Sequence, residues 1–110
     1  MGKSQRDKGN RVERLLVNMF RGWGLKALRV PLSGATEYAK GDVDVYPPGR
    51  DAPLIGEVKS RKKIPGWIKE WLGENDYLAL KGDREEFLFV VPEATMCELL
   101  GGDNEPGEAG

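Results

Sequence analysis

The sequence predicts an α/β domain in which helices flank a mixed β-sheet, with elements in the order α-β-β-β-α-β-β-α. Three stretches carry apolar residues at the spacing of a helix, and five shorter apolar stretches are bounded by residues that favour turns. No segment repeats within the 110 residues and no polar linker interrupts them. One domain with a modest core is therefore expected.

The first helix is expected over residues 10–23, and Gly22 and Gly24 provide its end. Its apolar stripe consists of Val12, Leu15, Leu16, Met19, Phe20 and Trp23. Residues 1–8 are polar and basic, and they are expected to form a flexible arm ahead of a single domain over residues 9–100. Residues 101–110 are rich in Gly and Glu and lack periodicity, which predicts a disordered acidic tail.

The first three strands are expected at residues 25–31, 42–46 and 54–59, with a flexible loop over residues 32–40. The second and third of these strands read as a hairpin around the Pro-Pro-Gly turn that begins at Pro47.

The remaining elements follow in the second half of the chain. A helix is expected from Pro65 to Gly73, since proline suits a first turn and glycine a helix end. Strands are expected at residues 77–80 and 87–91, and a last short helix over residues 92–100.

The register of the hairpin decides which side chains meet. One simple register pairs Tyr46 with Pro53. That register sets Asp42 opposite Glu57 and leaves Asp44 diagonal to it. The sequence alone does not fix this register, because the glycine before Glu57 is a candidate bulge that would re-aim the end of the strand.

Composition excludes several classes of site. The chain has no histidine, which removes Ser-His-Asp and Cys-His catalysis and zinc sites that use histidine. Its single cysteine, Cys97, cannot form an internal disulfide, which fits a reducing compartment such as the cytoplasm. No apolar run reaches the about 18 residues of a membrane span, and the basic N-terminus lacks the apolar core of a secretory signal. Neither a membrane partner nor a small-molecule cofactor is expected.

Charge is distributed unevenly, although the formal net charge is −1. Residues 1–29 hold eight Lys or Arg and two acidic residues, whereas residues 82–110 hold one arginine and eight acidic residues. A basic end is typical of a protein that contacts phosphates. A solvated charged tail is the alternative explanation for the first ten residues.

Asp44 and the sequence Glu57-Val58-Lys59 form the most informative motif of the chain. Side chains at i and i+2 of a strand point the same way, so Glu57 and Lys59 project from one face. Carboxylates on neighbouring strands, with a lysine beside them, suit a divalent metal and a nucleophilic water next to a phosphate. A cross-strand or neighbouring ion pair is the alternative explanation of Glu57 and Lys59.

The chemistry expected of this motif is metal-dependent phosphodiester hydrolysis. Asp44, Glu57 and the backbone carbonyl of Val58 would hold Mg²⁺, with Mn²⁺ as a substitute. Lys59 would stabilise charge at the phosphate, and Glu13, from the edge of the first helix, would orient the water or bind a second metal.

These residues resemble the PD-(D/E)xK nuclease superfamily, and more closely the archaeal-type Holliday junction resolvases, including forms carried by phages. The resemblance covers roughly residues 8–63. It consists of five elements in order: Lys8-Gly9-Asn10-Arg11-Val12-Glu13-Arg14, then Arg29, then Ser33-Gly34, then Val43-Asp44-Val45, then Glu57-Val58-Lys59.

The resemblance implies a restriction-endonuclease-like core and a homodimer that cuts four-way DNA junctions symmetrically with Mg²⁺. By position, catalytic roles are implied for Glu13, Asp44, Glu57 and Lys59. Contacts near the scissile phosphate are implied for Arg14, Arg29 and Ser33. Further contacts to the junction are expected from the basic N-terminus and from the basic run after the motif, that is from Lys3, Arg6, Lys8, Arg11, Arg61, Lys62 and Lys63.

The chain also departs from the family pattern. The loop before Asp44 is longer, the usual proline before that aspartate is absent, and Asp42 is an extra candidate ligand. Trp67 and Trp71 are expected in the core or the dimer interface, with base stacking as the alternative. Two other functions stay open: a nuclease for duplex, nicked or flap DNA, and a DNA-binding module without catalysis.

Overall fold

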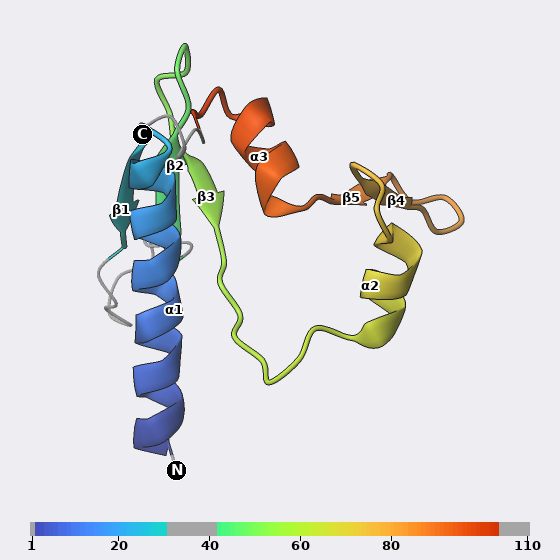
Figure 1. Cartoon of the computed structure of the whole chain (residues 1–110), viewed down its shortest axis with the longest axis horizontal. Helices are drawn as coiled ribbons and strands as arrows, with labels where there is room; N and C mark the ends of the chain where they lie inside the picture. Colours follow the sequence, from blue (N-terminus) through green and yellow to red (C-terminus); the bar gives the residue numbers. More distant parts are fainter. Residues whose placement is uncertain (1, 31–41, 104–110) are drawn as a thin grey trace.

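The computed structural model of the chain describes residues 2–30 and 42–103, and the expected loop over residues 32–40 lies outside them. Within the described residues the order of helices and strands is the predicted one, which confirms the α/β class (Figure 1). The elements are α1 (Gly2–Gly22), β1 (Lys26–Arg29), β2 (Val43–Tyr46), β3 (Leu54–Gly56), α2 (Gly66–Leu72), β4 (Leu78–Leu80), β5 (Leu88–Val90) and α3 (Glu93–Leu99).

The described strands form two antiparallel sheets, β1-β2-β3 and β4-β5, where the sequence suggested one mixed sheet. The reason lies after β3, where residues 57–65 form a long connection that carries α2, β4 and β5 away from the edge of β3 (Figure 1). The register of the first sheet is the simple one, with Val43 opposite Gly56 and Val45 opposite Leu54. Gly56 pairs within this ladder, so the possible bulge does not form there.

Helix α1 begins at Gly2, eight residues before the expected start at residue 10. Residues 2–8, expected to form a flexible arm, are therefore helical in the structure. Lysine, glutamine and arginine are good helix formers, and the glycine at position 9 costs only about 1 kcal/mol, so nothing there stops the helix. The end is as expected. Gly24 adopts a φ of 89°, and the amide of Leu25 donates to the carbonyl of Phe20.

The core lies between α1, one face of the first sheet, and α3. Ala27 of β1 and Val43 and Val45 of β2 are buried against α1. The buried side chains are Val17, Phe20, Trp23, Leu25, Ala27, Val43, Val45, Cys97 and Leu100. This packing fixes α1 on one face of the sheet and leaves the other face to carry the polar residues of β2.

The segment after α3 is held against the core at its beginning. The amide of Gly102 donates to the carbonyl of Cys97 over 2.8 Å, and the amide of Asp103 donates to the carbonyl of Trp23 over 2.8 Å. A Cβ at Gly102 would lie 2.9 Å from the Cβ of Trp23, so this close approach requires glycine. Residues 104–110 of the expected tail lie outside the described part of the chain. No described helix is long and apolar enough to cross a membrane.

Candidate functional site

Strand β2 turns Asp44 and Tyr46 away from the core. Val43 and Val45 are buried, while Asp44 and Tyr46 are only partly covered, as the alternation of a half-buried strand requires. Asp44 pairs with Ile55 of β3. Glu57 follows β3 directly, one residue after Gly56 and two residues after Ile55.

Asp44 carries a buried oxygen. Its Oδ1 is inaccessible to solvent and has no hydrogen-bond partner among the described residues. A buried acceptor without a partner costs about 1–3 kcal/mol, and more if it is charged. The position therefore suits a carboxylate whose partner is supplied from outside the described chain.

Glu57 and Lys59 form an ion pair at the surface. The Nζ atom of Lys59 lies 3.1 Å from Oε2 of Glu57, and the two side chains are 78% and 60% exposed. A pair exposed to this degree is worth at most about 1 kcal/mol. The carboxylate of Glu57 can thus leave the ammonium group at little cost.

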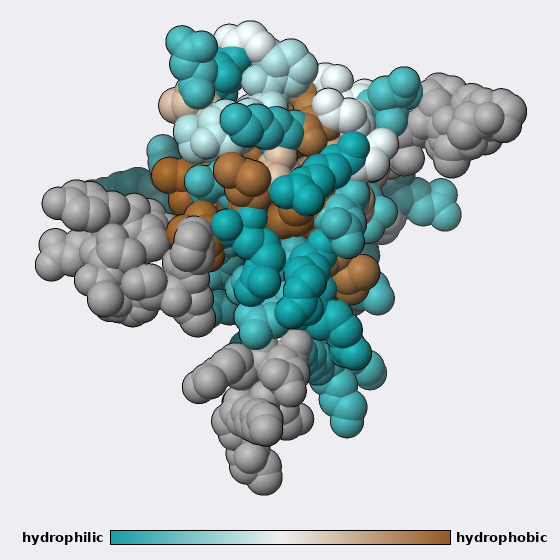
Figure 2. Space-filling view, turned by 90° about the vertical axis from the view of Figure 1, so that its left-hand side faces the viewer, coloured by the Kyte–Doolittle hydropathy of each residue, from teal (hydrophilic) through white to brown (hydrophobic). Residues whose placement is uncertain are grey.

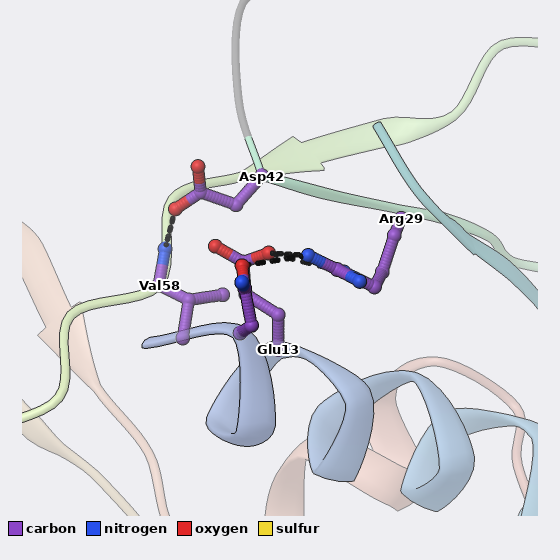
Figure 3. A network of polar contacts seen from close by, with 5 residues as sticks. Glu13, Arg29, Asp42 and Val58 are labelled. Carbon is purple, nitrogen blue, oxygen red and sulfur yellow. Dashed lines mark hydrogen bonds and ion pairs between the residues drawn. The ribbon is translucent and has the colours of Figure 1, made fainter. Parts of the chain in front are cut away.

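Asp42 ties the end of β3 to the start of β2. Its Oδ2 accepts a hydrogen bond of 2.7 Å from the backbone amide of Val58, and its own amide donates to the carbonyl of Gly56 over 2.8 Å (Figure 3). These bonds set Asp42 beside the strand end that carries Glu57. Asp42, the extra candidate ligand of the sequence, thus makes a contact that joins the two strands through one of its carboxylate oxygens.

Glu13 lies on α1 and is bound by Arg29 of β1. The Nε and Nη2 atoms of Arg29 donate to Oε1 of Glu13 over 3.1 and 3.0 Å, and Nη2 also donates to Oδ1 of Asn10 over 2.9 Å (Figure 3). Asn10 and Glu13 are three residues apart, so they share one face of the helix. Asn10 was not selected from the sequence, although this spacing and its place in the Lys-Gly motif pointed to it.

The structure brings the expected catalytic residues together in pairs. Glu13 meets Arg29, Glu57 meets Lys59, and Asp44 lies opposite Ile55, two residues before Glu57. Within residues 2–30 and 42–103, no three acidic, histidine or cysteine side chains lie close enough to hold a metal ion jointly. The set of Glu13, Asp44 and Glu57 around one ion is thus not assembled in this conformation.

Comparison with known proteins decides the family. A family model described as archaeal Holliday junction resolvase (Hjc) matches residues 4–98. The chain belongs to the archaeal Holliday junction resolvase family. No curated protein and no solved structure matches it. The match extends well beyond the segment that carried the resemblance, and it includes α2, β4 and β5.

Membership of the Hjc family implies a nuclease that binds branched DNA, and nucleases of this kind are generally metal-dependent. The residues present fit a hard divalent cation in their chemistry. Oxygen ligands from one or two carboxylates are what Mg²⁺ takes, and Asp44 offers a buried oxygen without a partner in the described chain. Glu57, directly after β3, adds an exposed carboxylate.

Basic residues line two hollows. One, of about 470 Å³, lies between the first half of α1 and the segment after β3, and it is lined by Lys8, Gly9, Val58, Lys59, Ser60, Arg61 and Lys62. The other, of about 280 Å³, lies beside α1 and β1 and is lined by Arg14, Val17, Asn18, Arg21 and Arg29. The side of the molecule that carries α1 and β1 is mostly hydrophilic (Figure 2). Phosphates are the natural ligands of such surfaces.

The other expected DNA contacts are placed as follows. Lys3 and Arg6 lie in the first turns of α1, Arg11 and Lys63 are exposed, and Ser33 lies outside the described residues. Arg21 was missed by the sequence analysis. Its Nε donates to the carbonyl of Ala27 over 3.0 Å while it lines the same hollow as Arg29.

Proposed function

We propose that the protein is a Holliday junction resolvase of the PD-(D/E)xK type, a Mg²⁺-dependent endonuclease that hydrolyses phosphodiester bonds symmetrically in four-way DNA junctions. The family match over residues 4–98 supports the substrate class. The observation that carries the proposed chemistry is the register of β2 and β3: Asp44, whose buried oxygen lacks a partner in the described chain, lies opposite Ile55, two residues before Glu57.

Asp44 and Glu57 would hold the Mg²⁺, with the backbone carbonyl of Val58 as a further oxygen and Mn²⁺ as a substitute ion. When bound, the ion supplies Lewis acidity and neutralises charge at the scissile phosphate. Glu57 is free to turn from Lys59 towards Asp44, because the exposed ion pair that holds it is weak.

Lys59 would then stabilise the charge that develops on the phosphate. Its ammonium group is already held beside Glu57, 3.1 Å away, and it lines the hollow that also contains Arg61 and Lys62. A cation beside the scissile phosphate stabilises the charge that develops there in the transition state. The two neighbouring cations would bind the flanking phosphates.

Arg29 of β1, held by Glu13 of α1, would position a phosphate as well. Glu13 and Asn10 hold the guanidinium group through Nε and Nη2, so its direction is fixed. Both contacts to Glu13 use Oε1, and Oε2 accepts no hydrogen bond from the described part of the chain. That oxygen would orient the attacking water.

Symmetric cleavage requires two copies of this site. One site cuts one strand, and a C2 homodimer presents two identical sites related by the symmetry of the junction. Recognition would rest on shape and phosphate contacts, not on base edges. We place the enzyme in the cytoplasm, or in the host cytoplasm for a phage-carried form, since a single cysteine suits a reducing compartment.

The test is incubation with a synthetic immobile four-way junction and Mg²⁺, followed by mapping of the nicks. Paired nicks at symmetric positions in two opposed strands are expected, with loss of cutting in EDTA. The component duplexes, a nicked duplex and a flap serve as controls. If these controls are cut as well as the junction, the protein is a nuclease of broader substrate range and not a junction resolvase.

A DNA-binding module without catalysis is the second candidate. It is favoured by the ion pair between Glu57 and Lys59 and by the lack of a three-acid cluster among the described residues. Calorimetry with Mn²⁺ separates the two. A module of this kind takes up no metal through its carboxylates, whereas the nuclease binds Mn²⁺ and loses that binding on Asp44→Asn.

A further inference from the structure

The segment between β3 and α3 leaves its apolar side chains exposed. We call residues 60–90 the projecting segment; it contains α2, β4 and β5 and extends away from the core (Figure 1). No residue of this segment is buried. Its exposed large apolar side chains are Ile64, Trp67, Trp71, Tyr77, Phe87, Leu88 and Phe89, each between 48% and 66% exposed.

These side chains form aromatic clusters instead of a core. The rings of Trp67 and Trp71 lie 5.0 Å apart, and the ring of Phe89 lies 5.8 Å from Tyr77 and 6.1 Å from Phe87. Contiguous apolar surface of this kind is rare on monomeric proteins and marks an interaction site. Trp67 and Trp71, expected in the core or the dimer interface, are exposed in the single chain and do not lie in its core.

Residues 60–90 include no buried residue in the single chain, so their exposed aromatic side chains are available to a second surface.

The core carries a matching apolar groove. A hollow of about 390 Å³ opens between α1, the edge strand β3 and α3. The apolar side chains that line its outer part are Leu16, Met19, Leu54, Ile55, Val91 and Met96. Ile55 is 57% exposed, and β3 pairs with β2 on one side only within the described chain.

We propose that two copies of the chain exchange their projecting segments, so that α2, β4 and β5 of each copy pack into the apolar groove and against the edge of β3 of the other. The inference rests on the homodimer of the proposed function and names how that homodimer is built. It does not depend on nuclease activity. Both surfaces belong to one chain, so a C2 pair covers both reciprocally and leaves neither open.

A second copy is the occupant that accounts for both surfaces at once. The groove is lined mainly by apolar side chains, the projecting segment exposes aromatic side chains, and both are uncovered in the single chain. A free β3 edge also invites pairing with another strand. The alternative, in which the projecting segment folds back on its own core, is an outcome of the test below.

The test is site-directed crosslinking of the full-length chain. Ile55→Cys places a thiol in the groove and Phe89→Cys places one on the projecting segment, while Cys97 is 2% exposed and stays unreactive in the native protein. Each variant carries a different tag, and the two are co-expressed and treated with a short bis-maleimide. A covalent dimer that contains one copy of each variant is expected.

The controls distinguish the possible arrangements of the projecting segment. Wild type and each single variant alone should give no covalent dimer. A dimer from Phe89→Cys alone would mean docking between two projecting segments and would overturn the exchange. Intramolecular crosslinking in a chain that carries both cysteines, with a monomeric mass by light scattering, would show that the segment folds back on its own core. A dimeric mass with no crosslink in any arm would also overturn the exchange.

A charge substitution gives an independent readout. Trp71→Glu should abolish the dimer in light scattering, whereas Leu99→Glu, at a residue that is 69% exposed outside the groove and the projecting segment, should leave it intact. Neither measurement uses DNA or metal. An exchanged dimer without junction cleavage would therefore refute the proposed function alone, and junction cleavage by a dimer without exchange would refute this inference alone.

Discussion

At the scale of single residues, two aspartates on neighbouring positions of the same strand face have different roles. Asp42 accepts a hydrogen bond from the amide of Val58 and thereby joins β2 to the end of β3. Asp44 has a buried oxygen without a partner in the described chain. Asp42 thus makes a contact that stabilises the fold, whereas Asp44 keeps a binding capacity that the fold does not use.

Substitution of each aspartate by asparagine separates these roles. Asp44→Asn should abolish Mn²⁺ binding and leave the free energy of unfolding unchanged or slightly higher, since a charged oxygen without a partner is removed. Asp42→Asn keeps an acceptor for the Val58 amide and should leave Mn²⁺ binding largely intact. Calorimetry and urea unfolding measure both. The reverse pattern would make Asp42 the ligand.

Glu57 should be required for cutting and not for binding. Glu57→Gln keeps the shape and removes the charge, so junction cleavage should fall by about 100-fold or more while junction affinity changes less than threefold. Glu98→Gln, at an exposed position of α3, is the matched control. Equal single-turnover rates for the two variants would exclude Glu57 from catalysis.

At the scale of elements, α1 is joined to the sheet by a core and by one polar contact. Phe20 and Trp23 pack edge to face with ring centroids 5.6 Å apart above Val45 and Ala27. Nearer the start of the helix, Arg29 of β1 binds Glu13, and the two side chains are 32% and 18% exposed. The polar contact thus fixes the rotation of α1 where the site lies.

The ion pair between α1 and β1 should be measurable by a double-mutant cycle. Glu13→Gln and Arg29→Gln should each lower the free energy of unfolding, with a coupling energy of about 1 kcal/mol for this partly exposed pair. Urea unfolding of both single variants and the double variant gives the value. Additive effects would mean that the contact does not contribute to stability.

At the scale of the whole molecule, the chain consists of a small packed core and a projecting segment that has no core of its own. Nothing in residues 60–90 is buried in the single chain. The stability of this segment must therefore depend on a second surface. In the proposed dimer that dependence makes folding and association one event.

Thermal stability should consequently depend on protein concentration. Dilution lowers the population of a dimer whose folding and association are coupled, so the Tm should fall by several degrees for each hundredfold dilution. Trp71→Glu should lower the Tm and remove its concentration dependence. Calorimetry at two concentrations checks both, and a Tm independent of concentration in the wild type would contradict the coupling.

The basic hollow next to Lys59 should bind phosphates without regard to sequence. The double variant Arg61→Gln/Lys62→Gln should weaken binding of every junction similarly and reduce the slope of log K against log salt by about 0.9 for each lost contact. Lys81→Gln, at an exposed lysine outside both hollows, is the control. An unchanged slope would place the DNA elsewhere.

The sequence by itself determined the order of elements, the alternation that turns Asp44 away from the core, and the family. These properties depend on local periodicity and on a motif, and both can be recognised in the sequence without the tertiary structure. It did not determine that α1 begins at Gly2, because good helix formers leave the start of a helix undefined.

Only the tertiary structure decided which side chains meet across elements. The contact of Glu13 with Arg29 depends on the rotation of α1 above the sheet, and the contact of Asp42 with Val58 depends on where β3 ends. The path of residues 57–65 decided that Trp67 and Trp71 lie outside the core. The pattern of apolar residues indicates which side chains are to be buried, but the three-dimensional path of the chain decides which groups they pack against.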